Sequence, residues 1–231
     1  MTKRKTLKEL TIRDNFMFSA VMCEEDNCKR FLELVLEFPI ARVEVSKEKS
    51  LVYHPEYAEL PDSYVIFICD FDPFGCGKYR YSFRNACKED SNSQLEDGVA
   101  TIFLSTKGTN ADEVSEAMVK FLKYVGADLK TSMEDFGDDF VCHLQKSVHD
   151  IKQSRRMEER YMFTSLLMQD ERRAGRLEGR KDTILESLSE FGSVPSELEE
   201  KIKNEKDVNK LKAWTKLVIR IESIEQFLEE M

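Results

Sequence analysis

The run of five consecutive apolar residues from Val65 to Cys69, within SYVIFICDF, constrains the fold more than any other feature. A strand that is apolar on both faces is typical of the centre of an α/β sheet that has helices on each side. The segments KYRYSF and ATIFLST predict further strands, with a loop over 88–98 between them. Alternation over 43–51 predicts a half-buried strand earlier in the chain. From Asp112 onward, nearly all of the sequence has helical periodicity.

The periodicity divides the sequence into three parts. Residues 1–139 predict an α/β domain, residues 140–192 a long charged helix, and residues 193–231 a small helical C-terminal unit. Within the long helix, Gly175 and Gly179 each precede an arginine. Each glycine weakens a helix by about 1 kcal/mol relative to alanine. We therefore expect the hinge between the sheet domain and the tail at these two glycines.

Short polar residues mark the expected starts of helices. Asp14 and Asn27 are predicted to cap the two helices that precede the strands. Ser196 and Glu199 are three residues apart and predict a capping box in the C-terminal unit. The apolar residues around Trp214 recur at helical spacing, which predicts a core or a self-association surface in that unit.

The composition narrows the range of functions. With 35 basic and 44 acidic residues the net charge is -9, which excludes a generally basic nucleic-acid-binding surface but not a local basic patch. Six cysteines without CxxC spacing, and an N-terminus without an apolar leader, predict a cytoplasmic protein with reduced thiols. No apolar run has the length of a transmembrane helix, so no membrane partner is expected.

Asp70 and Asp72 follow the apolar run and are the first candidates for chemistry. On an extended strand their carboxylates point to the same face, where they could ligate Mg²⁺ at the carboxyl end of a strand. The alternative is that Asp72, which precedes Pro73, starts the turn after the strand. We favour the turn, because two carboxylates alone specify no reaction.

The histidines and the basic cluster are weaker candidates. His143 and His149 are six apart, which does not place them on one helical face, and His54 lies in an expected loop. Any of the cysteines, Cys142 beside His143 included, could meet a histidine after folding, and nothing in the local sequence selects one. A cluster of basic residues is interrupted by Glu171 and Glu178 and lacks interleaved aromatic residues, so we expect a solvated, ion-paired helix face. Its members are Arg172, Arg173, Arg176, Arg180 and Lys181.

Six segments taken together resemble one family. They are LTIRDNFMFSAVM, FLELVLEFPIARVEVSKEKSLVYHPEY, SYVIFICDFDPFG, TIFLSTKG, VKFLKYV and DERRAGRLEGR. This combination, from Leu7 to the C-terminus, resembles the PD-(D/E)XK nuclease family transposases, also described as recombination-promoting nucleases and found widely in bacteria. The resemblance implies a restriction-endonuclease-like mixed sheet flanked by helices, a Mg²⁺-dependent DNA endonuclease activity that promotes recombination, and a helical tail with Gly-Arg repeats.

The segment that carries the catalytic motif of that family is missing here. In the family, VYHPEY precedes a strand with an Asp, a hairpin partner with Glu-x-Gln and a helix, whereas here Tyr57 is followed almost at once by AELPDSYVIF. Cleavage in this superfamily needs carboxylates from two adjacent strands to hold Mg²⁺. Asp70 and Asp72 match a later strand and Asp14 matches a helix cap. The resemblance therefore assigns no catalytic, cofactor-binding or metal-ligating residue, and tight Mg²⁺ binding is not expected.

The missing segment also has consequences for the fold. Glu59 and Asp62 lie near the junction, but Pro61 between them argues against a continuous replacement strand. Loss of a paired hairpin leaves unpaired edge groups and exposed apolar side chains. We therefore expect a truncated α/β sheet that is either marginally stable or rearranged. The rearranged sheet would use residues 43–53, 63–71, 78–83 and 100–105.

Three functional hypotheses follow. The first is a member of the nuclease family that has lost its active site by internal deletion, for which DNA is only a weakly expected partner. The second is a non-catalytic partner that keeps the helical tail and assembles with itself or with an intact relative. The third is an active enzyme that uses another carboxylate set, such as Asp70 and Asp72.

Overall fold

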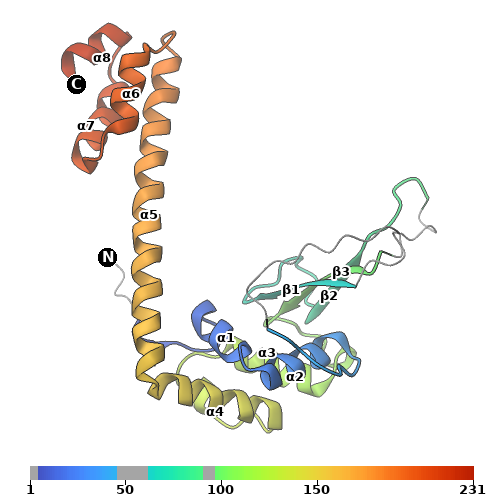
Figure 1. Ribbon diagram of the computed structural model, residues 1–231. Helices are drawn as coiled ribbons and strands as arrows, with labels where there is room; N and C mark the ends of the chain where they lie inside the picture. The colour runs from blue at the N-terminus through green and yellow to red at the C-terminus, as the bar shows by residue number, and fades with distance from the viewer. Residues whose placement is uncertain (1–4, 46–61, 91–96) are drawn as a thin grey trace. The chain divides into compact units, whose positions relative to one another are not determined.

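The structure is a computed structural model that describes residues 5–45, 62–90 and 97–231. It is of mixed α/β type, with a small three-stranded sheet and a predominance of helix (Figure 1). The chain divides into two compact units, Met1–Glu158 and Glu159–Met231. Each unit has its own hydrophobic core.

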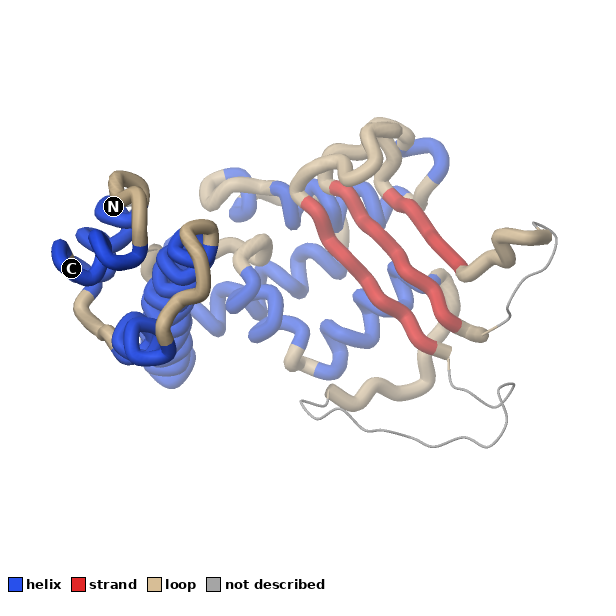
Figure 2. The backbone as a smooth tube through the Cα atoms, turned by 90° about the horizontal axis from the view of Figure 1, so that it is seen from above, coloured by secondary structure: helices blue, strands red, loops and turns tan. Residues whose placement is uncertain are grey.

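The sheet of the first unit consists of β1 (Ser63–Cys69), β2 (Arg80–Arg84) and β3 (Val99–Ser105). The strand order is β1-β3-β2. Strand β3 runs parallel to β1 and antiparallel to β2. Figure 2 shows the three strands side by side, with helices beneath them. Among the described residues the central strand is therefore β3, and the prediction that the run from Val65 to Cys69 lies at the centre is wrong.

The reason is that β1 is apolar on both faces, whereas the described residues cover only one of them. Its alternate residues Ile66 and Ile68 face the helices, whereas Val65 and Phe67 on the other face are each 46% exposed. An uninterrupted apolar run has the same composition in both situations, so sequence periodicity cannot separate an open face from a buried one.

Three of the four expected strand segments are present, at 63–69, 80–84 and 99–105. In the fourth, residues 43–45 form no strand, and 46–53 lie outside the described residues. His54, Tyr57 and Glu59 also lie outside them. The expectation of exposed apolar side chains next to the junction is confirmed by β1 itself.

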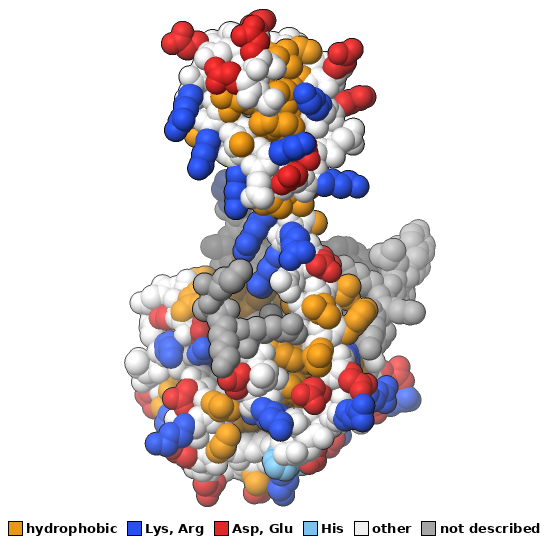
Figure 3. Space-filling view, turned by 90° about the vertical axis from the view of Figure 1, so that its left-hand side faces the viewer, with side chains coloured by type: hydrophobic (Ala, Val, Ile, Leu, Met, Phe, Trp, Pro, Cys, Tyr) orange, Lys and Arg blue, Asp and Glu red, His pale blue; other side chains and the backbone are white. Residues whose placement is uncertain are grey.

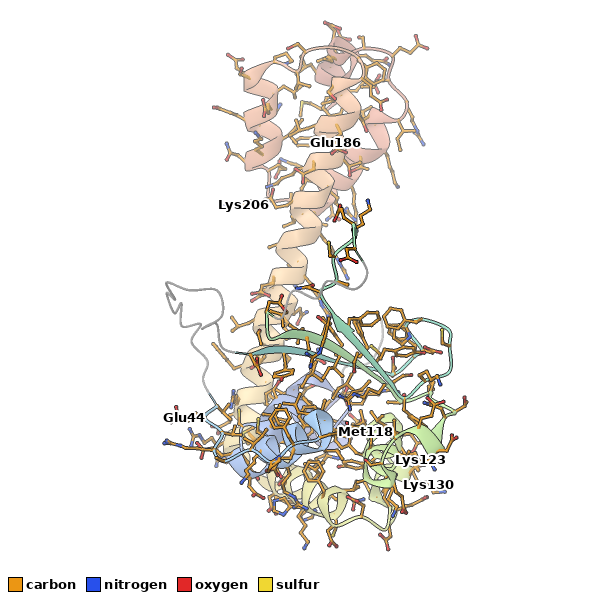
Figure 4. The ribbon with its side chains drawn as sticks, turned by 90° about the vertical axis from the view of Figure 1, so that its right-hand side faces the viewer. Glu44, Met118, Lys123, Lys130, Glu186 and Lys206 are labelled. Atoms are coloured by element: carbon orange, nitrogen blue, oxygen red, sulfur yellow. The ribbon has the colours of Figure 1, made fainter. Side chains whose placement is uncertain are left out.

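Four α-helices of the first unit form the layer under the inner face of the sheet (Figure 1). They are α1 (Asn15–Met22), α2 (Glu25–Leu36), α3 (Glu116–Gly126) and α4 (Asp139–Gln153). Short 3-10 helices precede α1 (Leu7–Glu9), α3 (Ala111–Glu113) and α4 (Thr131–Met133). Phe121 of α3 is fully buried, and its ring lies 5.5 Å from that of Phe31 and 6.0 Å from that of Phe140. Met118 of the same helix is buried, whereas Lys123 is on its exposed side (Figure 4).

The two predicted helix caps of this unit differ in outcome. Asp14 is at the N-cap position of α1, as expected, although its carboxylate accepts a hydrogen bond from the backbone N–H of Thr11 (2.8 Å). Asn27 lies inside α2, whose N-cap is Glu24, so this cap prediction is wrong. The Asn27 side chain is buried, and its amide donates to the Ser147 hydroxyl of α4 (3.0 Å). The Asn27 side chain therefore makes a tertiary contact with α4, which could not be predicted from the local sequence.

The second unit is a helical bundle made from most of α5 (Arg155–Ser189) together with α6 (Ser196–Asn204), α7 (Val208–Val218) and α8 (Ile224–Glu230). Its core consists of apolar residues from all four helices. They are Ile184, Leu188, Leu198, Ile202, Leu211, Trp214, Val218, Ile221, Ile224 and Phe227. The stripe around Trp214 is thus core, as one of the two interpretations had it. Figure 3 shows other hydrophobic side chains at the surface of this bundle, among charged ones.

The helical tail differs from its predictions in several places. The single helix over 140–192 is two helices, because Ser154 is extended (φ −81°, ψ 113°). The bundle begins before residue 193, because Ile184 and Leu188 of α5 belong to its core. Ser196 is the first residue of α6 and follows Pro195, so the capping box does not form. Helix α5 is continuous through Gly175 and Gly179, so no break in the helix marks the expected hinge there.

Candidate functional site

Asp70 and Asp72 lie where the chain leaves β1, and the structure gives them separate surroundings. The strand ends at Cys69, and the backbone bends at Asp70 and Phe71. The two-residue alternation of an extended strand therefore does not continue to Asp72. The prediction that both carboxylates point to one face is wrong for this reason.

The Asp72 carboxylate closes the loop after β1. One oxygen accepts the backbone N–H of Gly77 (2.7 Å), and the other accepts the N–H of Phe74 (3.2 Å) and the Tyr81 hydroxyl (2.6 Å). Gly77 has φ +68°, a left-handed conformation that glycine adopts at little cost. The Tyr81 hydroxyl, and then the Gly77 N–H, hold the pKa of Asp72 below its usual value. The turn interpretation of Asp72 is therefore confirmed.

Asp72→Asn is expected to lower the stability of the first unit at neutral pH and to flatten its acid dependence. Because the folded-state pKa lies below the ordinary value of 3.8, ionised Asp72 stabilises the fold above pH 3.8, and this stabilisation is lost as the pH falls through the folded-state pKa. Urea unfolding followed by circular dichroism from about pH 7 to about pH 2 measures the effect. A difference between wild type and variant that is unchanged at the acid end contradicts this role.

Asp70 lies at the rim of a cavity of about 430 Å³ in the first unit. The inner side of β1, the start of α1 and α3 line the cavity, mostly with apolar side chains such as Ile66, Ile68 and Val125. Arg13 lines it too, and its guanidinium lies 3.6 Å from the Asp70 carboxylate. Both charged side chains are about half exposed, so this ion pair contributes little to stability. A guanidinium beside the carboxylate opposes cation binding there.

The opposite face of the sheet is a surface of aromatic side chains, here called the outer aromatic face. Phe67 stacks on Phe103 of β3, with ring centroids 4.7 Å apart. Phe74, from the loop after β1, packs against Phe103 (5.2 Å) and against Tyr81 of β2 (4.8 Å). The members of the face are Val65, Phe67, Phe74, Tyr81, Phe83 and Phe103. Several of them stay exposed, Phe74 by 43% and Phe83 by 44%.

The histidine and cysteine candidates do not assemble into a site. Cys142 and His149 are exposed on α4, and the His143 imidazole lies 3.7 Å from the Asp26 carboxylate. Within residues 5–45, 62–90 and 97–231, no three His, Cys, Asp or Glu side chains gather as a metal site would need. All six cysteines are free thiols, and burial raises the pKa of Cys28 and of Cys69, which disfavours the reactive thiolate.

The basic cluster of α5 divides into two groups. Arg172, Arg173 and Arg176 are exposed, and Arg180 is half-buried. Lys181 is buried in the bundle, where its ammonium donates to the backbone carbonyl of Lys203 (2.6 Å) and to Glu178 (3.0 Å). The prediction of a solvated face is thus wrong for Lys181. The spacing could have indicated this burial. Lys181 is three residues before Ile184 and seven before Leu188, the core residues of α5, and therefore shares their face.

Asp62, the remaining acidic residue of the junction, lies just before β1. Its carboxylate accepts a hydrogen bond from the Tyr64 hydroxyl (3.3 Å). Burial, and after it the Asp62 carboxylate, raises the pKa of Tyr64. Gly98 approaches Asp62 so closely that a Cβ at residue 98 would overlap it. Asp62 therefore has a structural role at the point where the pairing of β1 with β3 begins.

Comparison of the chain with protein-family models, with curated proteins and with solved structures finds no match. In the part of the chain that the structure describes, no helix is both long enough and apolar enough to cross a membrane.

Proposed function

We propose that this chain is a PD-(D/E)XK nuclease family transposase-like protein that does not cleave DNA itself. The family identity rests on the six sequence segments from Leu7 onward. The observation that best supports the loss of activity is the outer aromatic face next to β1, because it is the surface that removal of a hairpin and helix from a mixed sheet would leave.

The geometry of β1 agrees with that origin. Among the described residues β1 pairs only with β3, so its other edge has no partner strand there. Val65 and Phe67 are exposed on the outer aromatic face beside that edge. Monomeric proteins seldom expose contiguous apolar surface of this kind without a covering element or a partner. The sequence junction between Tyr57 and Asp62 immediately precedes this strand.

The two carboxylates after β1 do not fit the Mg²⁺ ion that the family implies. Divalent cations in such sites need carboxylate oxygens that converge from neighbouring strands. Asp72 already accepts three hydrogen bonds within its loop, and Asp70 lies beside the Arg13 guanidinium. We therefore derive no cleavage step through Asp70 or Asp72.

A second candidate function is that of a non-catalytic partner, which assembles with itself or with an intact member of the family. Exposed apolar side chains on α5, outside the core of the bundle, favour it. Neither candidate cleaves DNA. They differ in whether association with another chain is the function of this protein.

The cleavage assay that tests the proposal uses the purified full chain and supercoiled plasmid DNA, with Mg²⁺ or Mn²⁺. We expect no nicked or linear product above the background without protein, because no set of converging carboxylates is supplied by Asp70 and Asp72. Asp70→Ala and Asp150→Ala are run in parallel, since Asp150 is an exposed residue of α4 away from the sheet. Cleavage that is abolished in Asp70→Ala and retained in Asp150→Ala would overturn the proposal.

A further inference from the structure

Two cysteines lie at the corner where the chain passes from α1 to α2. Cys23 is the C-cap residue of α1 and has helical backbone angles (φ −69°, ψ −17°). Glu24 is the N-cap residue of α2, so Cys23 is at position N′ of that helix and Cys28 is at position N4. The hydrogen bond from the N–H of Cys28 to the carbonyl of Glu24 (3.0 Å) agrees with these positions. We call the segment from Cys23 to Cys28 the thiol corner.

Positions N′ and N4 are the two whose side chains meet in a hydrophobic staple. The extended N-cap residue Glu24 (φ −78°, ψ 121°) turns the residue before it back over the first turns of α2. With these backbone angles, ideal helix geometry places the Cα atoms of Cys23 and Cys28 about 6 Å apart. A disulfide joins residues whose Cα atoms are about 4.4–6.8 Å apart, so the thiol corner can close with little movement of the backbone.

Two further observations place the thiols beside each other. The side chain of Asn27 is fully buried, and its amide donates to the carbonyl of Val21 (3.1 Å), which holds the end of α1 against the first turn of α2. Burial, and after it the Cys23 thiolate, raises the pKa of Cys28. One anion has this effect on another thiol only at short range. The two thiols differ in access, because Cys23 is exposed and Cys28 is half-buried.

We propose that Cys23 and Cys28 form a reversible disulfide, which makes the thiol corner a site of oxidation by small-molecule disulfides. The exposed Cys23 thiolate attacks one sulfur of the small disulfide and forms a mixed disulfide. The small thiol that leaves takes up the proton that Cys23 has lost. The Cys28 thiolate then attacks the Cys23 sulfur, and the second small thiol leaves with the proton from Cys28.

The two steps together oxidise two cysteines and reduce one small disulfide to two small thiols. The second step separates this pair from a single cysteine, because Cys28 attacks within the same molecule and therefore at a high effective concentration. A single cysteine can only exchange back with the small thiol in solution. The inference goes beyond the proposed function, because it depends neither on DNA nor on a second chain.

The first test incubates the purified full chain in glutathione buffers, alkylates the remaining thiols and digests the chain with trypsin. The peptide 14–29 contains Cys23 and Cys28 and no other cysteine, whereas Cys76 is the single cysteine of the loop after β1. With reduced glutathione in excess, we expect peptide 14–29 without alkylation and lighter by two hydrogen atoms. Its oxidised fraction should exceed the fraction of Cys76 that carries glutathione by about tenfold.

The same digest contains the results that would overturn the proposal. One is a peptide 14–29 that is alkylated at both cysteines at every ratio of oxidised to reduced glutathione. The others are glutathione that stays attached to this peptide in place of the internal disulfide, and a disulfide from either residue to a third cysteine. Treatment of the oxidised chain with dithiothreitol should return both alkylation sites, because the disulfide is reversible.

The second test uses single variants to separate the two thiols. Cys28→Ser should leave glutathione on Cys23, because nothing then displaces it. Cys23→Ser leaves only the half-buried thiol, which should react about tenfold more slowly than Cys23 does in Cys28→Ser. Cys76→Ser is the matched control and should form the disulfide as the wild type does. Circular dichroism should show the same helix content in all three. Equal rates for Cys23→Ser and Cys28→Ser would overturn the assignment of Cys23 as the first thiol to react.

The third test compares the urea unfolding of the oxidised and the reduced chain. The oxidised chain should unfold at a higher urea concentration, because the disulfide restricts the unfolded state. Cys76→Ser should show the same shift, and Cys28→Ser should show none. An oxidised wild-type chain that unfolds at lower urea than the reduced chain would mean that the bond strains the thiol corner, which overturns the geometry proposed for it.

Discussion

Phe121→Ala is expected to lower the free energy of unfolding of the first unit by about 3–5 kcal/mol, the range for large-to-small changes of a buried aromatic residue. Phe121 is fully buried in α3, and its ring contacts the rings of Phe31 and Phe140. These two residues come from α2 and α4, so the cavity would open at the point where three helices meet. Because a domain of this size has a total stability of only about 5–15 kcal/mol, much of the unit's stability would be lost.

Urea unfolding followed by circular dichroism measures this change. Met133→Ala is the control in the same unit, because Met133 is 71% exposed and its truncation should cost less than about 0.5 kcal/mol. Equal midpoints for the two variants would mean that Phe121 does not fill the helical layer as described.

Phe227→Ala should have a comparable effect, about 3–5 kcal/mol, on the second unit. Phe227 of α8 is fully buried in the core that Trp214 shares. Trp214 is the single tryptophan of the chain, so its fluorescence reports the unfolding of this core specifically. The transition followed by fluorescence should therefore shift to markedly lower urea concentration.

The neighbouring residue supplies a matched control for this second change. Leu228 is adjacent in α8 but 46% exposed, so Leu228→Ala removes a similar apolar volume outside the core. We expect its fluorescence transition to stay close to that of the wild type. A Leu228→Ala shift as large as that of Phe227→Ala would show that the bundle core is not the one described.

The sequence predicted the strands well and their surroundings poorly. The strand-like segments predicted β1, β2 and β3 to within a few residues, because short segments of this kind between polar turns usually form strands. Whether both faces of β1 are covered depends on other parts of the chain, so its position beside β3, at the end of the sheet that the described residues form, was not predictable from its own residues. Asn27 and Ser196 show the same limit for helix starts, where a good capping residue was placed inside or at the first position of the helix.

The candidate site was predictable in part. The residue type of Asp72 and the proline after it indicated a turn, and its hydrogen bonds agree. The separation of Asp70 from Asp72 required knowing that β1 ends at Cys69, and strand ends are the least determined feature of a sequence.

The outer aromatic face also makes the tendency of the protein to aggregate depend on pH. At neutral pH a net charge of -9 keeps molecules apart, and this repulsion opposes contact between exposed phenylalanine rings on neighbouring molecules. Near the isoelectric point of about 5.1 the repulsion vanishes while the rings remain uncovered. Mild acidification therefore favours association between molecules at a pH where the Asp72 carboxylate is still ionised.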